Sequence, residues 1–330
     1  MPLPTAAQTA GASAAPGYAA LRGRSMGTTW TVRLPALPDE AQARRIGARI
    51  QAALDLIVDQ MSTWDETSDL CRLNRAPCGW YQVPEAFFQV LRCALEVADR
   101  SQGAYDPTVG RLVDLWGFGP CGPVDRPPEP ARISAALQTA GWRRTALNAP
   151  LRGVWQPGGL CFDLSSIAKG YGVDAMARVL DEHGVRHYLA ELGGELKLRG
   201  QGPRGGSWRL DIESPEPGGH GLPLCLTDTA IATSGDYRRR FEHGGQRYAH
   251  TLDPRSGRPL AHNLASVSVV HGTCMMADAL ATALLCMGPG QGPDYARRHG
   301  IAALFMTRHP EGIAVDWTPA FLDIAQPPGV

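Results

Sequence analysis

The spacing of apolar residues divides the first third of the chain into a strand, two helices and an intervening loop. Apolar and polar residues alternate over residues 28–34, and a proline follows that run. Apolar residues then recur at helical spacing over residues 46–61, and again over residues 84–100, where a glycine follows soon after the basic end. The polar stretch 62–77 between the two helices is predicted to be a loop.

The remainder of the chain combines helices with strands that are joined by short connections. Residues 120–130 are proline-rich and are predicted to form a surface excursion, followed by a short helix over 133–137 and a β run over 154–164. The order after that is a helix (166–182), five strands (188–198, 208–213, 224–233, 246–252 and 264–271), a helix (274–287), a short helix and two strands (301–306 and 312–317). Consecutive strands with short connections favour antiparallel pairing, so the predicted fold class is α+β, with largely antiparallel sheets and packed helices.

The chain shows no internal repeat and no linker long enough to separate two domains. We expect a single domain over residues 23–320, a disordered leader over 1–22 and a tail over 321–330. The N-terminal segment lacks the apolar stretch of a secretion signal, no early cysteine could carry a lipid, and no stretch approaches the roughly 18 apolar residues of a transmembrane helix. The expected location is cytoplasmic, or periplasmic or membrane-anchored if the N-terminus has been trimmed.

Charge and cysteine usage exclude several classes of protein. The 330 residues hold 32 Lys and Arg against 32 Asp and Glu, without runs of like charge, which disfavours nucleic-acid binding. The 8 cysteines include no C-x-x-C pair and no histidine at zinc-ligand spacing, so free thiols are expected. Only Lys169 and Lys197 are lysines, and every other basic residue is Arg. A lysine kept against that bias is a candidate for a specific role.

The helix predicted over residues 274–287 carries two oxygen-bearing side chains on one face. Asp278 and Thr282 are four residues apart among apolar neighbours. If they are buried, each needs a polar partner, and a hard cation with oxygen ligands is one way to supply it. The alternative is a solvent-facing Asp and a Thr bonded to its own backbone.

Residues 163–172 predict a turn from a strand end into a helix start. Small residues and free amide groups at such a turn favour phosphate binding, and Lys169, one turn into the helix, adds a positive charge. The alternative is that a serine here is only a helix N-cap.

A strand that runs into an Asp-Pro turn carries His250 and Asp253. The two residues are close enough in sequence for the carboxylate to orient an imidazole that acts as a general base. Alternatively, Asp253 only forms the turn and His250 is structural.

Residues 103–119 combine tight backbone with aromatic side chains. Such a segment suits a planar ring lying against backbone and side chains. The alternative is that Trp116 and Phe118 belong to the core.

Eight blocks, taken in chain order, resemble the FAD:protein FMN transferase (ApbE) family. They span about residues 23–317, nearly all of the expected domain. The blocks are residues 25–28, 61–64 with 73–74, 103–108, 163–170, 192–195, 232–237, 250–259 and 277–283. The resemblance implies an ApbE-like (T-fold-like) architecture and an Mg2+-dependent transferase with FAD as its substrate. In that reaction a threonine hydroxyl of an acceptor protein attacks the FMN-side phosphorus, and AMP is released.

The resemblance also implies roles for individual residues. Asp278 and Thr282 are expected to hold Mg2+, joined by an oxygen of Ser166 and the carbonyl of Ala281. His250 is expected to be the base that acts on the incoming threonine, with Asp253 as its orienter. The expected contacts with FAD are Met26, Trp64, Ala104, Tyr105, Asp106, Asp163, Lys169 and Leu252, and Trp64 stands where family members often carry Tyr. The expected partners are FAD and an acceptor protein with an exposed threonine motif, with no nucleic acid and no transmembrane segment.

Two other functions remain open at this point. The same residues serve an Mg2+-dependent FAD pyrophosphatase in which water replaces the threonine. A non-catalytic flavin-binding protein is a third possibility, although such a protein has no use for a metal or a base. Release of free FMN without an acceptor favours the second function, and binding without AMP release favours the third.

Overall fold

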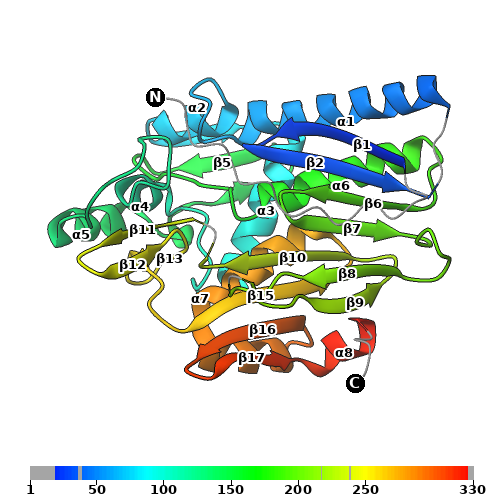
Figure 1. Ribbon diagram of the computed structural model, residues 1–330. Helices are drawn as coiled ribbons and strands as arrows, with labels where there is room; N and C mark the ends of the chain where they lie inside the picture. The colour runs from blue at the N-terminus through cyan, green and yellow to red at the C-terminus, as the bar shows by residue number, and fades with distance from the viewer. Residues whose placement is uncertain (1–18, 36–38, 217, 238, 326–330) are drawn as a thin grey trace.

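An eight-stranded sheet forms the middle of the molecule (Figure 1). The computed structural model describes residues 19–35, 39–216, 218–237 and 239–325. The strand order is β1-β2-β6-β7-β10-β15-β16-β17, and every neighbouring pair is antiparallel. Smaller sheets pair β3-β5-β4, β8-β9, β11-β12 and β13-β14. The predicted α+β class with largely antiparallel sheets is therefore confirmed.

The strands of the described residues are β1 (Ala19–Ser25), β2 (Thr28–Leu34), β3 (Gly79–Gln82), β4 (Leu147–Asn148), β5 (Gly153–Gln156), β6 (Tyr188–Leu192), β7 (Glu195–Arg199), β8 (Trp208–Ile212), β9 (Leu222–Leu226), β10 (Ala230–Gly235), β11 (Arg240–His243), β12 (Gln246–Ala249), β13 (Leu252–Asp253), β14 (Arg258–Pro259), β15 (Leu264–His271), β16 (Ala302–His309) and β17 (Gly312–Trp317). The helices are α1 (Glu40–Met61), α2 (Asp69–Arg75), α3 (Glu85–Arg100), α4 (Gly110–Leu115), α5 (Pro130–Thr139), η1 (Trp142–Arg144), α6 (Ala168–Glu182), α7 (Cys274–Arg298) and α8 (Pro319–Ala325).

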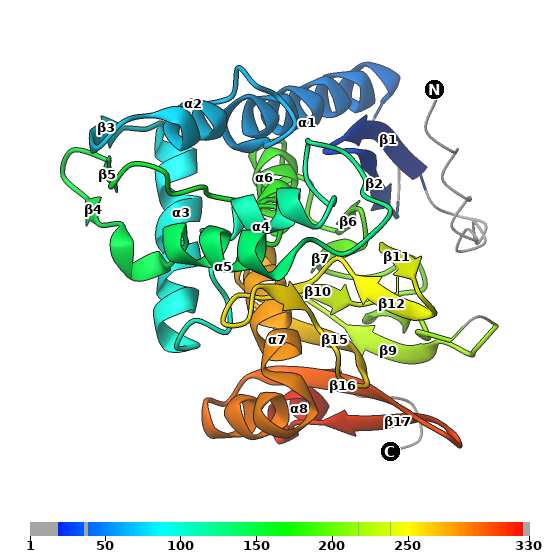
Figure 2. The same ribbon diagram turned by 90° about the vertical axis from the view of Figure 1, so that its left-hand side faces the viewer.

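Both faces of the large sheet are covered. Helices α1, α6 and α7 pack on one face, where α6 contacts both α1 and α7, and α3 lies against α7 (Figure 1). On the other face, the β8-β9 pair and α8 close a second apolar core around Trp208 and Phe321. Helices α4 and α5 stand together beside the β11-β12 pair (Figure 2).

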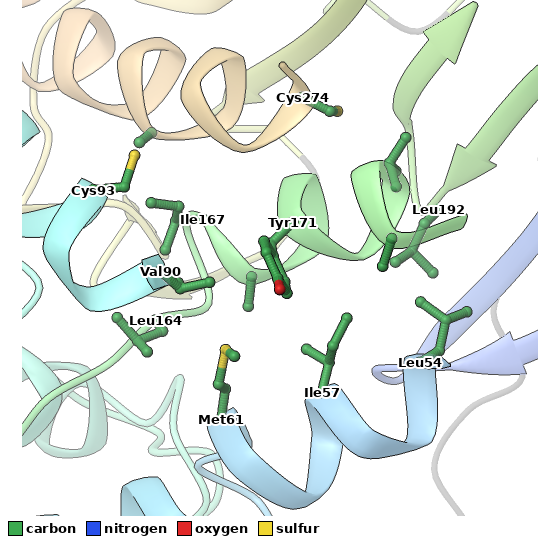
Figure 3. Close-up of a cluster of buried hydrophobic side chains, with 14 of the residues drawn as sticks. Leu54, Ile57, Met61, Val90, Cys93, Leu164, Ile167, Tyr171, Leu192 and Cys274 are labelled. Carbon is green, nitrogen blue, oxygen red and sulfur yellow. The ribbon is translucent and has the colours of Figure 1, made fainter. Parts of the chain in front are cut away.

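The main core forms where α1, α3, α6 and α7 meet (Figure 3). Helix α1 buries a stripe at helical spacing that includes Leu54, Ile57 and Met61, as the sequence pattern predicts. Tyr171 of α6 lies in the middle of this cluster, with Val90 of α3 on one side. The packing fixes α6 between α1 and α7, and α6 and α7 carry Lys169 and three of the expected metal ligands, Asp278, Ala281 and Thr282.

The structure corrects several predicted boundaries. The run 188–198 is two strands, because Gly193 and Gly194 take positive φ values of 65° and 108° and turn the chain into a hairpin. The run 224–233 is likewise split, into β9 and β10. The predicted loop over residues 62–77 contains helix α2, which Ser68 caps with its side chain.

The ends of the domain also differ from the prediction. Strand β1 begins at Ala19, inside the expected leader, because it pairs with β2 along its full length. Helix α8 extends to Ala325, inside the expected tail. The rest of the leader and tail, residues 1–18 and 326–330, lies outside the described residues. None of the described helices is both long and apolar enough to cross a membrane.

Candidate active site

The contact between α6 and α7 is the centre of the site, and it depends on a glycine. A Cβ atom at Gly170 would lie 2.4 Å from the carbonyl oxygen of Cys274, so only glycine lets the two helices approach this closely. At this approach the amide of Gly170 donates a hydrogen bond of 3.0 Å to Oδ2 of Asp278. The helix start predicted to bind phosphate and the helix predicted to bind a metal ion are therefore in direct contact.

A carboxylate from α6 fixes the beginning of α7. Thr273, at the N-cap, makes no capping hydrogen bond with its side chain. Instead, Oδ1 and Oδ2 of Asp174 accept hydrogen bonds from the amides of Cys274 (3.1 Å) and Met275 (2.9 Å). Lys197, one of the two lysines, donates to Asp174 at 3.1 Å and so neutralises part of its charge. This arrangement sets the position of α7 against α6.

Asp278 is a buried carboxylate with only 4% of its surface exposed, so the alternative of a solvent-facing Asp is wrong. The pKa of Asp278 is raised to about 7, mainly because the carboxyl group is buried; the charge of Glu195 also raises it, whereas the charge of Lys169 and the Gly170 amide lower it. A buried carboxylate of this kind favours a cation beside it.

The other expected metal ligands supply neutral oxygens. Thr282 Oγ1 lies 2.8 Å from Ser234 Oγ and does not bond to its own backbone, while Ala281 is fully buried. Ser166 Oγ donates to the hydroxyl of the buried Tyr105 at 3.1 Å. Neither serine of the turn caps α6 with its side chain, since Ile167 occupies the N-cap. Among the described residues, no three His, Cys, Asp or Glu side chains gather as a metal site. One carboxylate with hydroxyl and carbonyl oxygens nevertheless fits the ligands that Mg2+ prefers.

Lys169 links the two helices to the rest of the site. Its ammonium group forms an ion pair with Oε1 of Glu195, which is 2% exposed, while Glu195 Oε2 has no hydrogen-bond partner within the described structure. The charge of Lys169 acts on both Asp278 and His250. Sequence reasoning missed Glu195 as a site residue, although it follows the Gly-Gly turn of a block that carries the resemblance.

His250 is held as a neutral imidazole. Its Nδ1 lies 3.2 Å from the carbonyl oxygen of Arg239. A carbonyl only accepts hydrogen bonds, so Nδ1 carries the proton and Nε2 keeps its lone pair. Burial lowers the pKa of His250 to about 4, and the charges of Arg239 and Lys169 contribute in the same direction. Phe118 packs its ring edge-on against the imidazole, with the ring centres 6.2 Å apart.

Asp253 does not orient His250, and that prediction is corrected. Its Oδ1 accepts hydrogen bonds from Nε of Arg255 at 2.8 Å and from the Arg255 amide at 3.0 Å. The imidazole instead bonds to the carbonyl of Arg239, the residue directly before β11. Asp253 forms the turn, as the alternative interpretation held, because the geometry of an Asx turn directs its carboxylate forward along the chain.

The residues expected to contact FAD differ in exposure: Met26 and Trp64 are at least partly exposed, whereas several others are buried. Met26 takes a positive φ of 49° in the turn between β1 and β2, and its Cε faces α6 at Gly172. Trp64 is 61% exposed and free to stack on a planar ring. Asp163, Ala104, Tyr105 and Leu252 are buried, and the Leu252 carbonyl accepts from Cys286 Sγ at 3.5 Å.

Asp106 anchors a turn with both oxygens. Its Oδ1 accepts from the amide (2.8 Å) and the hydroxyl (2.7 Å) of Thr108, and its Oδ2 accepts from the Trp142 amide at 3.1 Å. The aromatic residues after this turn are structural: Trp116 is 1% exposed, stacks on Tyr248 and donates through Nε1 to the Gly257 carbonyl. The core interpretation of Trp116 and Phe118 is confirmed.

A small cavity of about 150 Å3 opens between α2, α4 and the extended segment 161–163. Whole ligands occupy pockets of roughly 300–1,000 Å3, so this cavity suits one ring or group of a larger molecule. It is lined by Thr63, Cys71, Asn74, Arg75, Gly110, Val113, Asp114, Gly119, Pro120, Cys161, Phe162 and Asp163. The cysteines in its wall are free thiols, as are all eight, in agreement with the sequence-based expectation.

Comparison with known proteins gives consistent matches over the whole domain. Residues 26–305 match the ApbE family. The chain is 36% identical over 295 residues to the FAD:protein FMN transferase of Vibrio cholerae, covering 88% of each protein. The crystal structure of the Pseudomonas stutzeri flavinyl transferase ApbE in its apo form superposes with a TM-score of 0.85 at 36% identity, covering 93% of this chain and 96% of that one. The flavin transferase ApbE from Vibrio cholerae gives a TM-score of 0.86 at 34% identity, covering 93% of this chain and 99% of that one.

Proposed function

The chain belongs to the ApbE family, and from this premise we propose that it is an Mg2+-dependent FAD:protein FMN transferase that acts on a threonine of an acceptor protein. The observation that carries the proposal is the position of Lys169. Its ammonium group pairs with the buried Glu195, and the next residue, Gly170, donates its amide to the buried carboxylate Asp278. The charge of Lys169 also helps to keep the imidazole of His250 neutral by lowering its pKa. A pyrophosphate needs positive charge beside it, and the attacking hydroxyl needs a base, so Lys169 joins two halves of one reaction centre.

The proposed reaction is an in-line displacement at phosphorus. The threonine oxygen bonds to the FMN-side phosphorus, the bond from that phosphorus to the oxygen shared with AMP breaks, and AMP leaves with the bridging oxygen. Nε2 of His250 takes the proton of the threonine hydroxyl, because the bond from Nδ1 to the Arg239 carbonyl leaves Nε2 unprotonated. At the low pKa of His250 the proton passes readily to the leaving phosphate or to water.

The residues that would hold Mg2+ are Asp278 and Thr282, with Ser166 and the Ala281 carbonyl. Bound there, the ion would neutralise charge on the pyrophosphate oxygens. The chain's own contribution is to keep these oxygens together through the bond from Gly170 to Asp278 and the pair of Thr282 with Ser234. Lys169 is positioned by Glu195 to add its charge at the helix start.

The test is chromatography of the nucleotides that the purified protein releases from FAD. The reaction is run with Mg2+ or with EDTA, and with or without a candidate threonine-bearing acceptor domain. AMP together with covalent flavin on the acceptor supports the transferase, whereas AMP with free FMN makes the protein a pyrophosphatase. Intact FAD in the presence of Mg2+ and an acceptor that a known transferase can modify leaves only flavin binding.

Two variants connect the outcome to the site. Asp278→Ala should abolish Mg2+-dependent turnover while the folding transition remains cooperative. His250→Ala should lower kcat by about 100-fold or more, the usual scale for a lost general base, with little change in FAD affinity. Equal losses in turnover and in affinity would make His250 a binding residue instead.

A further inference from the structure

Helix α7 is interrupted six residues after Thr282, the last of the expected metal ligands. Gly288 takes a non-helical conformation, with φ 77° and ψ −179°, and the next residue is Pro289. Proline has no amide hydrogen, so the carbonyl of Leu285 lacks its usual helical donor. A carbonyl in this position needs a donor from elsewhere in the protein.

Two side chains from a single segment supply donors to the carbonyls of this last turn. His262 Nε2 lies 3.0 Å from the Leu285 carbonyl oxygen and Arg255 donates to the Cys286 carbonyl oxygen at 3.0 Å. Both donors lie after β13, and Figure 2 shows this yellow segment against the orange helix α7. A cation near the last carbonyls of a helix is also favourable for its dipole.

The contacts close a ring between the segment and the helix. Asp253 holds Arg255 through Nε at 2.8 Å, and Arg255 bonds to the Cys286 carbonyl. The thiol of Cys286 in turn donates to the carbonyl of Leu252, at 3.5 Å, and Leu252 precedes Asp253. Each member of the ring thus restrains the next.

The ring joins the two halves of the proposed reaction centre. On one side, Leu252 follows His250 by two residues. On the other side, Cys286 follows Thr282 by four residues, which is about one helical turn. A change in how the segment sits on α7 would therefore change the distance between the base and the expected metal ligands.

We propose that Arg255 and His262 are positioning residues that hold the segment after His250 in a fixed position on α7, the helix that carries Asp278 and Thr282, and that the role of Asp253 is to aim Arg255. The inference rests on the proposed function, which assigns His250 the role of general base. It assigns Asp253 an indirect part in the reaction, in place of the direct contact with His250 that the sequence suggests.

The test compares Arg255→Met with Arg258→Met on the same turn. Arg255 is half exposed, so its replacement should not prevent folding, and the side chain of Arg258 makes no hydrogen bond or ion pair within the described structure. Arg255→Met is expected to lower kcat about tenfold with KM for FAD changed less than twofold, whereas Arg258→Met should match the wild type. Asp253→Asn combined with Arg255→Met should be no slower than Arg255→Met alone, since both act through one contact.

A second readout does not depend on turnover. Hydrogen exchange at residues 250–263 and 284–287 should be faster in Arg255→Met than in Arg258→Met, and His262→Gln should slow exchange relative to His262→Ala because an amide can still donate to Leu285. Failure of the wild type to modify any acceptor would remove the proposed function, and the exchange data would still decide whether the ring restrains the segment. Equal kcat in the two Arg variants, or equal exchange, would overturn the positioning role.

Discussion

At the scale of single residues, the imidazole of His250 is oriented by a backbone carbonyl and not by a carboxylate. A carboxylate partner would raise the pKa of the ring, whereas here burial and two positive charges lower it to about 4. The Arg239 carbonyl still fixes which nitrogen carries the proton. The result is a base that is unprotonated throughout the neutral pH range, at the cost of lower basicity.

His250 should therefore remain neutral and protonated on Nδ1 at pH 5.5. Nitrogen–proton correlation spectra of the histidine rings measure this directly, with His250→Asn identifying the signal among the 9 histidines. The unfolded chain takes up this proton near pH 6.5 and the folded chain near 4, so the group's contribution to folding stability is complete above 6.5 and is lost as the pH falls from 6.5 to 4. A ring that titrates near 6.5 in the folded protein would contradict the account.

The pair of Lys169 and Glu195 makes a second prediction at this scale. Glu195→Gln removes the charge that faces Lys169 and is expected to lower the free energy of unfolding by about 1–3 kcal/mol, less than for a fully buried pair because Lys169 is partly exposed. The double variant Lys169→Met with Glu195→Gln should recover part of this loss, because both charges of the pair are then removed together. Urea denaturation measures both, and a Glu195→Gln protein as stable as the wild type would count against a buried ion pair.

At the scale of secondary-structure elements, the contact between α6 and α7 sets the position of Asp278. Gly170 lets the helices touch at Cys274 and Met275, Asp174 caps the same two residues from α6, and the break at Gly288 ends the first straight segment of α7. Two of these features therefore act at the start of the segment and one at its end. The position of Asp278 follows from them.

Gly170→Ala should displace α7 and disturb the site. The added methyl group meets backbone atoms of Cys274 and Met275, which cannot move aside without shifting the helix. We expect a loss of about 1–3 kcal/mol in stability and a fall in Mg2+-dependent AMP release. Gly47→Ala in α1 is the matched control, since a Cβ there meets nothing within 4 Å; it should leave activity unchanged and stabilise the helix slightly. Similar activities for the two variants would show that the helix contact does not position the site.

The sequence predicts elements well where one pattern dominates. Strand β2 is found over residues 28–34 as predicted, and α1 follows its apolar stripe. The sequence predicts two runs as single strands because apolar residues lie on both sides of the short turns at 193–194 and 227–229. Positive φ values at Gly193 and Gly194 break the first of these runs. Helix α2 was missed because its polar surface hides its short apolar face.

The candidate site was predictable in its residues but not in its contacts. Asp278, Thr282, Lys169 and His250 stand out by residue type and spacing. The partners of these residues come from other segments, such as Glu195 and Ser234, and local pattern does not predict such contacts. The pairing of His250 with Asp253 was wrong for the same reason, since nearness in sequence did not place the two side chains together.

At the scale of the whole molecule, the fold brings segments that are far apart in the sequence together at the site. The amide of Gly170 meets Asp278 across 108 residues, and Ser166 meets Tyr105 across 61. The small apolar cluster that contains Trp116 contacts the turn after His250, because Nε1 of Trp116 donates a hydrogen bond to the carbonyl of Gly257, 141 residues later in the chain. Such a site forms only when the complete domain has folded, so the activity and the global unfolding transition should be lost together.

The most direct test of the central claim is tandem mass spectrometry of an acceptor domain after incubation with the protein, FAD and Mg2+, with AMP quantified in the same samples. The account predicts FMN on one threonine, one AMP for each modified acceptor at every time point, and neither product with His250→Ala above about one hundredth of the wild-type rate. Flavin on another residue type, or AMP that accumulates without modified acceptor, would contradict it.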